Sequence, residues 1–220
     1  MLKGKFGHIA TELRAHMPFT FFGALTGIAL MLIFKNLSER TTFGLFYVFH
    51  PGHVLLSAMV TASMFELHRR KKSFLPVVIV GIVGSIGIAT VSDSLIPYAG
   101  EVLLGMHVHA HGGESFAHSA HIGFIEEWYI VMPAAIGGVL IGYFRPKTKF
   151  PHAGHVLLST WASSFHILMA AKGHISITTA LAMLVFLFIA VWLPCCISDI
   201  VFPLLFVKGE ADHENVSSEV

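Results

Sequence analysis

Charged side chains are scarce in this chain. Asp, Glu, Lys and Arg make up 12 % of the 220 residues, whereas 55 % of the residues are hydrophobic. Soluble domains carry about 25 % charged residues, so this composition predicts an integral membrane protein embedded in a lipid bilayer. The net charge of +1 is uninformative about nucleic acid. No basic cluster is interleaved with aromatic residues in a polar context, which argues against a nucleic-acid-binding role.

Cysteines are few, and several familiar motifs are missing. The only two cysteines, Cys195 and Cys196, are adjacent, and neighbouring cysteines rarely bridge each other, so we expect no disulfide framework. The N-terminus has no signal-peptide cleavage pattern and is expected to be retained. The sequence contains no P-loop, GxSxG or HExxH motif, which argues against an ATP-driven mechanism and against two common hydrolase classes.

Apolar runs predict six membrane-spanning helices. They cover residues 18–34, 53–67, 74–96, 128–144, 155–171 and 175–207. A short amphipathic segment (1–16) precedes them, and a polar tail (208–220) follows. We expect helix breaks at His50-Pro51-Gly52 and at Pro194 and Pro203, because proline removes a backbone donor and clashes with the preceding turn. The fold class is therefore an all-α membrane protein with possible broken helices.

Histidine is abundant, with 15 residues, and part of it lies in a repeated motif. The pattern HxGHVLLS occurs at residues 50–57 and again at 152–159. Two further markers recur in the same order. Pro18 precedes Gly23 and Gly27 at the same offsets as Pro133 precedes Gly138 and Gly142, and Ser92-Asp93 with Pro97 matches Ser198-Asp199 with Pro203. These markers divide the chain into two three-helix repeats, at 1–127 and 128–220.

Three spans per repeat is an odd number, so the two repeats must insert in opposite directions, as in many secondary transporters. The GxxxG pairs permit close helix contact, within the chain or in a homo-oligomer. Basic residues set the orientation. One side of the predicted topology holds eleven of them: Lys3, Lys5, Arg14, Arg69, Arg70, Lys71, Lys72, Arg145, Lys147, Lys149 and Lys208. The other side holds three: Lys35, Arg40 and Lys172. Both termini are therefore expected in the cytoplasm, with the His-rich loop 101–127 outside.

Inversion predicts one cluster of ligands toward each face. The outer cluster is His50, His53 and Asp93, and the inner cluster is His152, His155 and Asp199. Imidazole and carboxylate suit Zn²⁺, Fe²⁺ or Mn²⁺, and a carboxylate inside a membrane is a functional candidate because it is costly to bury. The same carboxylates also suit proton transfer, so the ion that is moved stays open. Secondary metal or pathway candidates are Ser57, Ser159, Glu101, His107, His109, His111, His118 and His121.

Each feature also has a plainer interpretation. The polar helix stripes also fit hydrogen bonding between helices, and the loop histidines also fit a pH sensor rather than a metal-gathering site. Cys195 shares a helix face with Asp199; it is either a thiolate ligand for Zn²⁺ or copper(I), or, more often for this residue type, a small core residue.

The sequence favours a carrier of a divalent transition-metal cation rather than an enzyme. Two alternatives stay open. One is a metal-dependent intramembrane hydrolase with its ligands gathered at one depth, and the other is a haem-binding electron-transfer protein with paired histidines on facing helices.

Overall fold

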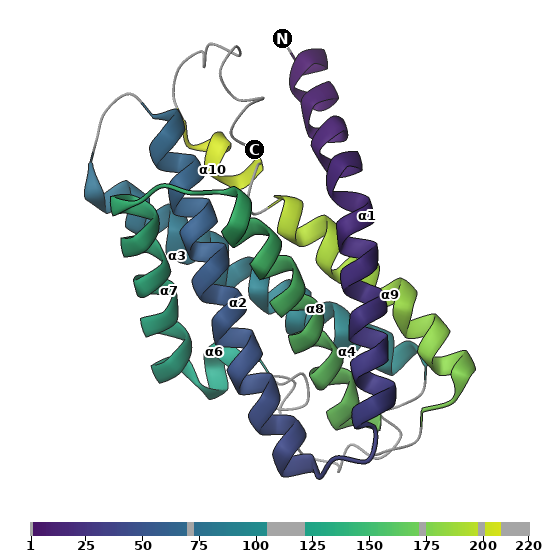
Figure 1. Cartoon of the computed structure of the whole chain (residues 1–220). Helices are drawn as coiled ribbons and strands as arrows, with labels where there is room; N and C mark the ends of the chain where they lie inside the picture. Colours follow the sequence, from purple (N-terminus) through teal and green to yellow (C-terminus); the bar gives the residue numbers. More distant parts are fainter. Residues whose placement is uncertain (1, 70–72, 105–121, 172–174, 198–200, 208–220) are drawn as a thin grey trace.

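The computed structural model describes residues 2–69, 73–104, 122–171, 175–197 and 201–207, and these are almost entirely helical, with no strand among them. The elements form one bundle (Figure 1). In chain order they are α1 (Leu2–Phe34), α2 (Glu39–His68), α3 (Phe74–Thr90), the π-helix η1 (Val91–Leu95), α4 (Ile96–Leu103), α6 (Gly123–Glu126), α7 (Trp128–Phe144), α8 (Lys149–Ala171), α9 (Ile177–Cys196) and α10 (Phe202–Leu205). The all-helical expectation is confirmed for these residues.

Four helical segments are long and apolar enough to cross a membrane: His16–Phe34, Glu39–His68, Phe74–Leu103 and Ile177–Cys195. The apolar helix α7 is shorter. Their outward side chains are apolar as well, since Ile33 is 70 % exposed and Ile177 is 78 % exposed. Helix α8 is more polar, with three histidines, three serines and a threonine, and it lies within the bundle rather than at its edge (Figure 1). These helices indicate a membrane protein.

Helix α2 is continuous through His50-Pro51-Gly52, so the break expected there is wrong. The N-cap residue of α2 is Ser38, whose side chain accepts a hydrogen bond from the backbone N–H of Thr41 at 3.2 Å. Pro51 removes one backbone donor, a loss that neighbouring helices can compensate inside a membrane. Because α2 starts at Glu39 instead of residue 53, His50 and His53 lie near the middle of a 30-residue helix and not at its mouth.

The third helix also extends further than expected. Instead of ending at residue 96, it runs from Phe74 through the π-helix to Leu103. In the π-helix the N–H of Ile96 donates to the carbonyl of Val91, five residues earlier. In that register residue 97 would donate to Ser92, but residue 97 is proline. The hydroxyl of Ser163 on α8 supplies the missing donor, 3.0 Å from the Ser92 carbonyl oxygen.

Two other boundaries differ from the sequence expectation. Helix α1 is a single helix from Leu2, so the stretch 1–16 is not separated from the first span. Helix α9 continues through Pro194 to Cys196, so no break occurs at that proline. Pro203 lies in the first turn of the short helix α10, a position where its missing N–H costs nothing.

Both GxxxG pairs contact helices of the same chain. A Cβ added to Gly23 would lie 3.1 Å from Thr160 Oγ1, and one on Gly27 would lie 2.5 Å from Ser164 Oγ, both on α8. Gly138 and Gly142 of α7 press against the backbone of α2 in the same way. These faces are therefore occupied within the chain. An oligomer through them stays a prediction.

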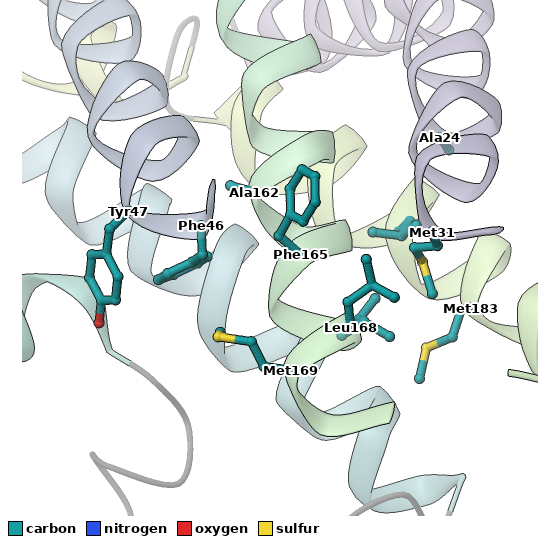
Figure 2. Close-up of a cluster of buried hydrophobic side chains, with 11 residues drawn as sticks. Ala24, Met31, Phe46, Tyr47, Ala162, Phe165, Leu168, Met169 and Met183 are labelled. Carbon is teal, nitrogen blue, oxygen red and sulfur yellow. The ribbon is translucent and has the colours of Figure 1, made fainter. Parts of the chain in front are cut away.

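Helices α2 and α8 cross the centre of the bundle in opposite directions (Figure 1). Their contact is reciprocal. A Cβ on Gly52 of α2 would lie 3.1 Å from Leu158, and a Cβ on Gly154 of α8 would lie 2.8 Å from Leu56. Gly52 and Gly154 are equivalent positions of the repeated motif, as are Leu56 and Leu158. A large apolar cluster packs beside this crossing, with Phe46, Phe165 and Met31 among its members (Figure 2).

Candidate metal centre

Asp93 is the hub of a buried polar cluster. Its side chain is 0 % exposed. One carboxylate oxygen, Oδ2, lies 2.9 Å from His50 Nδ1 and 2.7 Å from His53 Nδ1. The other, Oδ1, accepts hydrogen bonds from Ser92 Oγ at 2.8 Å and from Ser159 Oγ at 2.7 Å. Four donors thus surround one carboxylate, and they come from α2, η1 and α8.

The carboxylate fixes how both imidazoles are oriented. An ionised carboxylate only accepts hydrogen bonds, so His50 and His53 each donate from Nδ1. In a neutral ring this leaves the lone pair on Nε2, which is the nitrogen then able to bind a metal. Both Nε2 atoms are buried and have no hydrogen-bond partner among the residues that the structure describes. This is the arrangement in which an outer carboxylate positions histidine ligands and raises their basicity.

The three side chains of His53, His155 and Cys195 converge in the centre of the bundle. One ligand atom from each lies within 4.8 Å of the others, and all three residues are buried. The His53 and His155 rings meet edge to face, with centroids 5.4 Å apart. Ligand atoms around a tetrahedral zinc ion lie about 3.5 Å apart, given metal–ligand bonds of about 2.0–2.3 Å. Side-chain shifts of about one ångström would therefore close a three-ligand site.

A row of imidazoles leads away from this site. The His155 ring lies 5.0 Å from the His152 ring, and the His152 ring lies 4.3 Å from that of His16 on α1. Exposure increases along the row: His53 and His155 are fully buried, and His152 and His16 are half-buried. The row therefore runs from the buried site to His16, at the N-terminal end of the apolar span of α1.

On the other side, α6 covers His50. A Cβ added to Gly123 would come within 2.6 Å of His50 Nε2, so only glycine fits at this position. The hydroxyl of Tyr47, three residues before His50 on α2, donates to Glu126 Oε2 of α6. These contacts hold the short helix α6 against the polar cluster.

The two predicted ligand clusters therefore meet. We expected one cluster of three ligands to face outward and another to face the cytoplasm. The outer cluster was His50, His53 and Asp93; the inner one was His152, His155 and Asp199, of which Asp199 lies outside the described residues. The structure instead joins them through the His53–His155 ring contact and through the Ser159–Asp93 hydrogen bond. The reason is that α2 begins earlier than expected, which moves its histidines to the middle of the bundle.

Other predicted site residues are placed as follows. Ser57 is fully buried, and its hydroxyl has no hydrogen-bond partner among the described residues. Glu101 belongs to α4 and not to the polar loop; it is buried and lies 2.8 Å from His166 Nδ1. Asp199 and the loop histidines lie outside the described residues: His107, His109, His111, His118 and His121.

Sequence reasoning gave too little weight to three residues. Cys195 was expected as a core residue more than as a ligand, and His16 and His166 were not among the predicted site residues. For His166 and Cys195 a signal existed, because polar side chains on a membrane helix must face a partner or water. For His16 no such signal existed, since a histidine just before an apolar run is common.

Comparisons with protein-family models, with curated proteins and with solved structures find no match to this chain.

Proposed function

We propose that this protein is a membrane carrier for a divalent transition-metal ion, and that His53, His155 and Cys195 bind the ion at the centre of the bundle. The observation that carries the proposal is the convergence of these three ligand atoms within 4.8 Å in the membrane-spanning region. Buried polar side chains in such a region are costly, so their gathering on three helices favours a functional site over a packing accident.

Ligand chemistry favours Zn²⁺ among the candidate metals Zn²⁺, Fe²⁺ and Mn²⁺. Two imidazoles and a thiolate match the nitrogen and sulfur ligands that zinc prefers, whereas manganese prefers oxygen. Three protein ligands leave a fourth coordination position, which an ion in transit needs in order to enter and leave. In this reading Asp93 positions His53 through Nδ1 and contributes negative charge without itself ligating the ion.

An inverted repeat of three plus three helices supplies a route across the membrane. Support comes from the reciprocal contacts Gly52–Leu158 and Gly154–Leu56, which relate α2 and α8 as equivalent partners crossing in opposite directions. In transporters of this kind the substrate site lies at the repeat interface near the bilayer midplane. The imidazole row from His155 through His152 to His16 would guide the ion toward one face, and the other face would be reached past His50 and α6.

Removing one ligand tests the site directly. We expect His53→Ala, His155→Ala and Cys195→Ser each to weaken Zn²⁺ binding by at least about 100-fold, because even outer-sphere changes cost 10- to 100-fold. Zn²⁺ uptake into proteoliposomes should fall in parallel. Binding is measured by calorimetry on purified protein, and folding by thermal melting.

His68→Ala is the matched control. His68 lies on α2 like His53, but its ring bonds the carbonyl of Met64 at the helix end, 2.8 Å away. It should bind and move Zn²⁺ like the wild type. If folded His53, His155 and Cys195 variants kept wild-type affinity, the central site would be refuted.

Orientation is tested separately. We expect a tag at residue 112 to be labelled from outside intact cells and a tag at residue 220 to be labelled only after permeabilisation. The reason is the split of eleven to three in Lys and Arg between the two sides of the six-helix topology. Labelling of both tags in intact cells would contradict the inverted repeat.

A metal-dependent hydrolase is the second candidate, because it too predicts ligands gathered at one depth, as His53, His155 and Cys195 are. The two functions differ in how the metal behaves. A catalytic zinc stays bound through dialysis, whereas a transported ion exchanges. The haem alternative fits less well, since rings of His53 and His155 that touch leave no room for a porphyrin between them.

A further inference from the structure

A second buried ionisable pair lies apart from the metal centre. Glu101 on α4 and His166 on α8 are 0 % and 1 % exposed, and His166 Nδ1 lies 2.8 Å from Glu101 Oε1. Both belong to helices of the membrane-spanning bundle. Neither residue is one of the proposed metal ligands His53, His155 and Cys195.

Phe46 separates the pair from the metal centre. Its ring is stacked on that of His50 at 5.2 Å and meets the His166 ring edge to face at 5.7 Å. Figure 2 shows Phe46 on α2 opposite the α8 side chains Phe165 and Met169. An aromatic side chain thus stands between two polar sites that lie on the same pair of helices.

The groups facing the pair are mostly apolar. Helix α9 presents Phe186 to the backbone of Gly100 and carries no ionisable side chain before Cys195. Helix α1 has no ionisable residue from position 17 to 34. The remaining elements do carry titratable groups. Asp93 on η1 is bonded to two histidines, and on α2 His50 lies behind Phe46 and Tyr47 is bonded to Glu126. Helix α4 itself carries Tyr98, three residues before Glu101.

Charge balance then decides how the pair can be buried. With one proton shared between them, a carboxylate and an imidazole are neutral together, whether the proton lies on oxygen or on nitrogen. Without that proton the pair carries a net charge of −1, and an uncompensated charge in the membrane interior is costly. The closed arrangement of α4 against α8 therefore requires one bound proton.

We infer that Glu101 and His166 form a proton-binding site that couples metal movement to a proton gradient. This inference rests on the proposed carrier function. The pair takes one proton from water when the bundle opens, holds it while buried, and releases it when the bundle opens to the other side. No bond other than the O–H or N–H bond forms or breaks.

Two connections link this proton site to the metal centre. Helix α4 is the direct continuation of the π-helix that carries Asp93, and α8 carries His166 together with His155 and Ser159. A movement that separates α4 from α8 therefore acts on both sites at once. Phe46 keeps the two sites from exchanging protons directly through His50 and His166.

The test uses Glu101→Gln in proteoliposomes, with the membrane potential clamped by valinomycin and potassium. Glutamine keeps a hydrogen-bond acceptor for His166 but cannot be ionised. When a gradient of one pH unit is imposed in either orientation, each coupled proton changes the accumulation of Zn²⁺ about tenfold. We expect Glu101→Gln to lose about tenfold in accumulation per pH unit while keeping wild-type Zn²⁺ affinity.

Glu66→Gln is the matched control, because Glu66 is also buried but pairs with Arg69 at the end of α2. It should keep the wild-type response to pH. If Glu101→Gln does not fold, His166→Asn tests the same site with the same expected loss. An unchanged pH response in a folded variant, or a loss of Zn²⁺ affinity, would overturn the proton site alone. A wild type that moves no Zn²⁺ would overturn the carrier function and this inference together.

Discussion

Asp93→Asn should abolish Zn²⁺ transport and lower Zn²⁺ affinity about 10- to 100-fold while leaving the protein folded. The expected loss of affinity has this size because the substitution removes an outer carboxylate that positions a histidine ligand. Asp93 holds His50 and His53 through their Nδ1 atoms. Without its negative charge, the two imidazoles become weaker ligands and nothing offsets the charge of a divalent cation.

The fold should survive because asparagine fits the same contacts. Its oxygen can accept from the two imidazoles, and its NH₂ group can donate to Ser92 and Ser159, whose hydroxyls rotate to become acceptors. Asp93→Leu is the contrasting variant. It leaves the buried Nδ1 atoms of His50 and His53 without a partner, each costing about 1–3 kcal/mol, and should strongly destabilise the protein.

Ser164→Ala is the control for polar changes in this region, since Ser164 bonds the carbonyl of Thr160 on its own helix. It should bind and transport Zn²⁺ normally. The decisive measurement is calorimetry on folded Asp93→Asn, followed by uptake in vesicles. Wild-type binding and transport by that variant would show that the carboxylate is not needed, and the proposed site would fall with it.

Gly138→Ala should destabilise the protein strongly, whereas Gly137→Ala should not. A Cβ at Gly138 would overlap the carbonyl oxygen of Leu55 and come within 2.9 Å of Ala58 Cβ, both on α2. A Cβ at Gly137 meets nothing within 4 Å. Forcing extra volume into a packed interface costs about 1–3 kcal/mol, and more when the obstacle is backbone that cannot rotate away.

The two adjacent glycines make a closely matched pair, because both substitutions add one methyl group to the same turn of α7. Thermal melting in detergent should show a lowered midpoint for Gly138→Ala and an unchanged or slightly raised one for Gly137→Ala, since alanine favours helix over glycine. Zn²⁺ binding should weaken only in the first variant, because α2 carries His53. Equal melting midpoints would contradict the close packing of α7 on α2.

The sequence was informative about which residues matter and less so about their depth. Apolar runs identified the helices, and the doubled motif identified histidines that do converge. Continuity through Pro51 was not predictable, because whether a proline ends a helix depends on tertiary packing that one sequence does not reveal. That single difference moved His50 and His53 to the centre and merged two expected clusters.

The π-helix was the second feature that the sequence did not predict. A π-turn has no distinct composition, and Pro97 indicated an end to the helix. The hydroxyl of Ser163, 3.0 Å from the Ser92 carbonyl oxygen, supplies the donor that Pro97 lacks, and the helix continues to Leu103. A contact between helices 71 residues apart in sequence leaves no local signal. The Glu101–His166 pair was missed for the same reason.

The glycine contacts have a consequence for how the two halves of this chain came together. Gly27, in the first half, is packed on α8 of the second half, and Gly138, in the second half, is packed on α2 of the first. Each half thus packs one of its helices tightly against a helix of the other half. A half expressed alone would lack these packing partners. Under the inverted repeat proposed above, the two halves, expressed as separate chains, should therefore be stable only when made together.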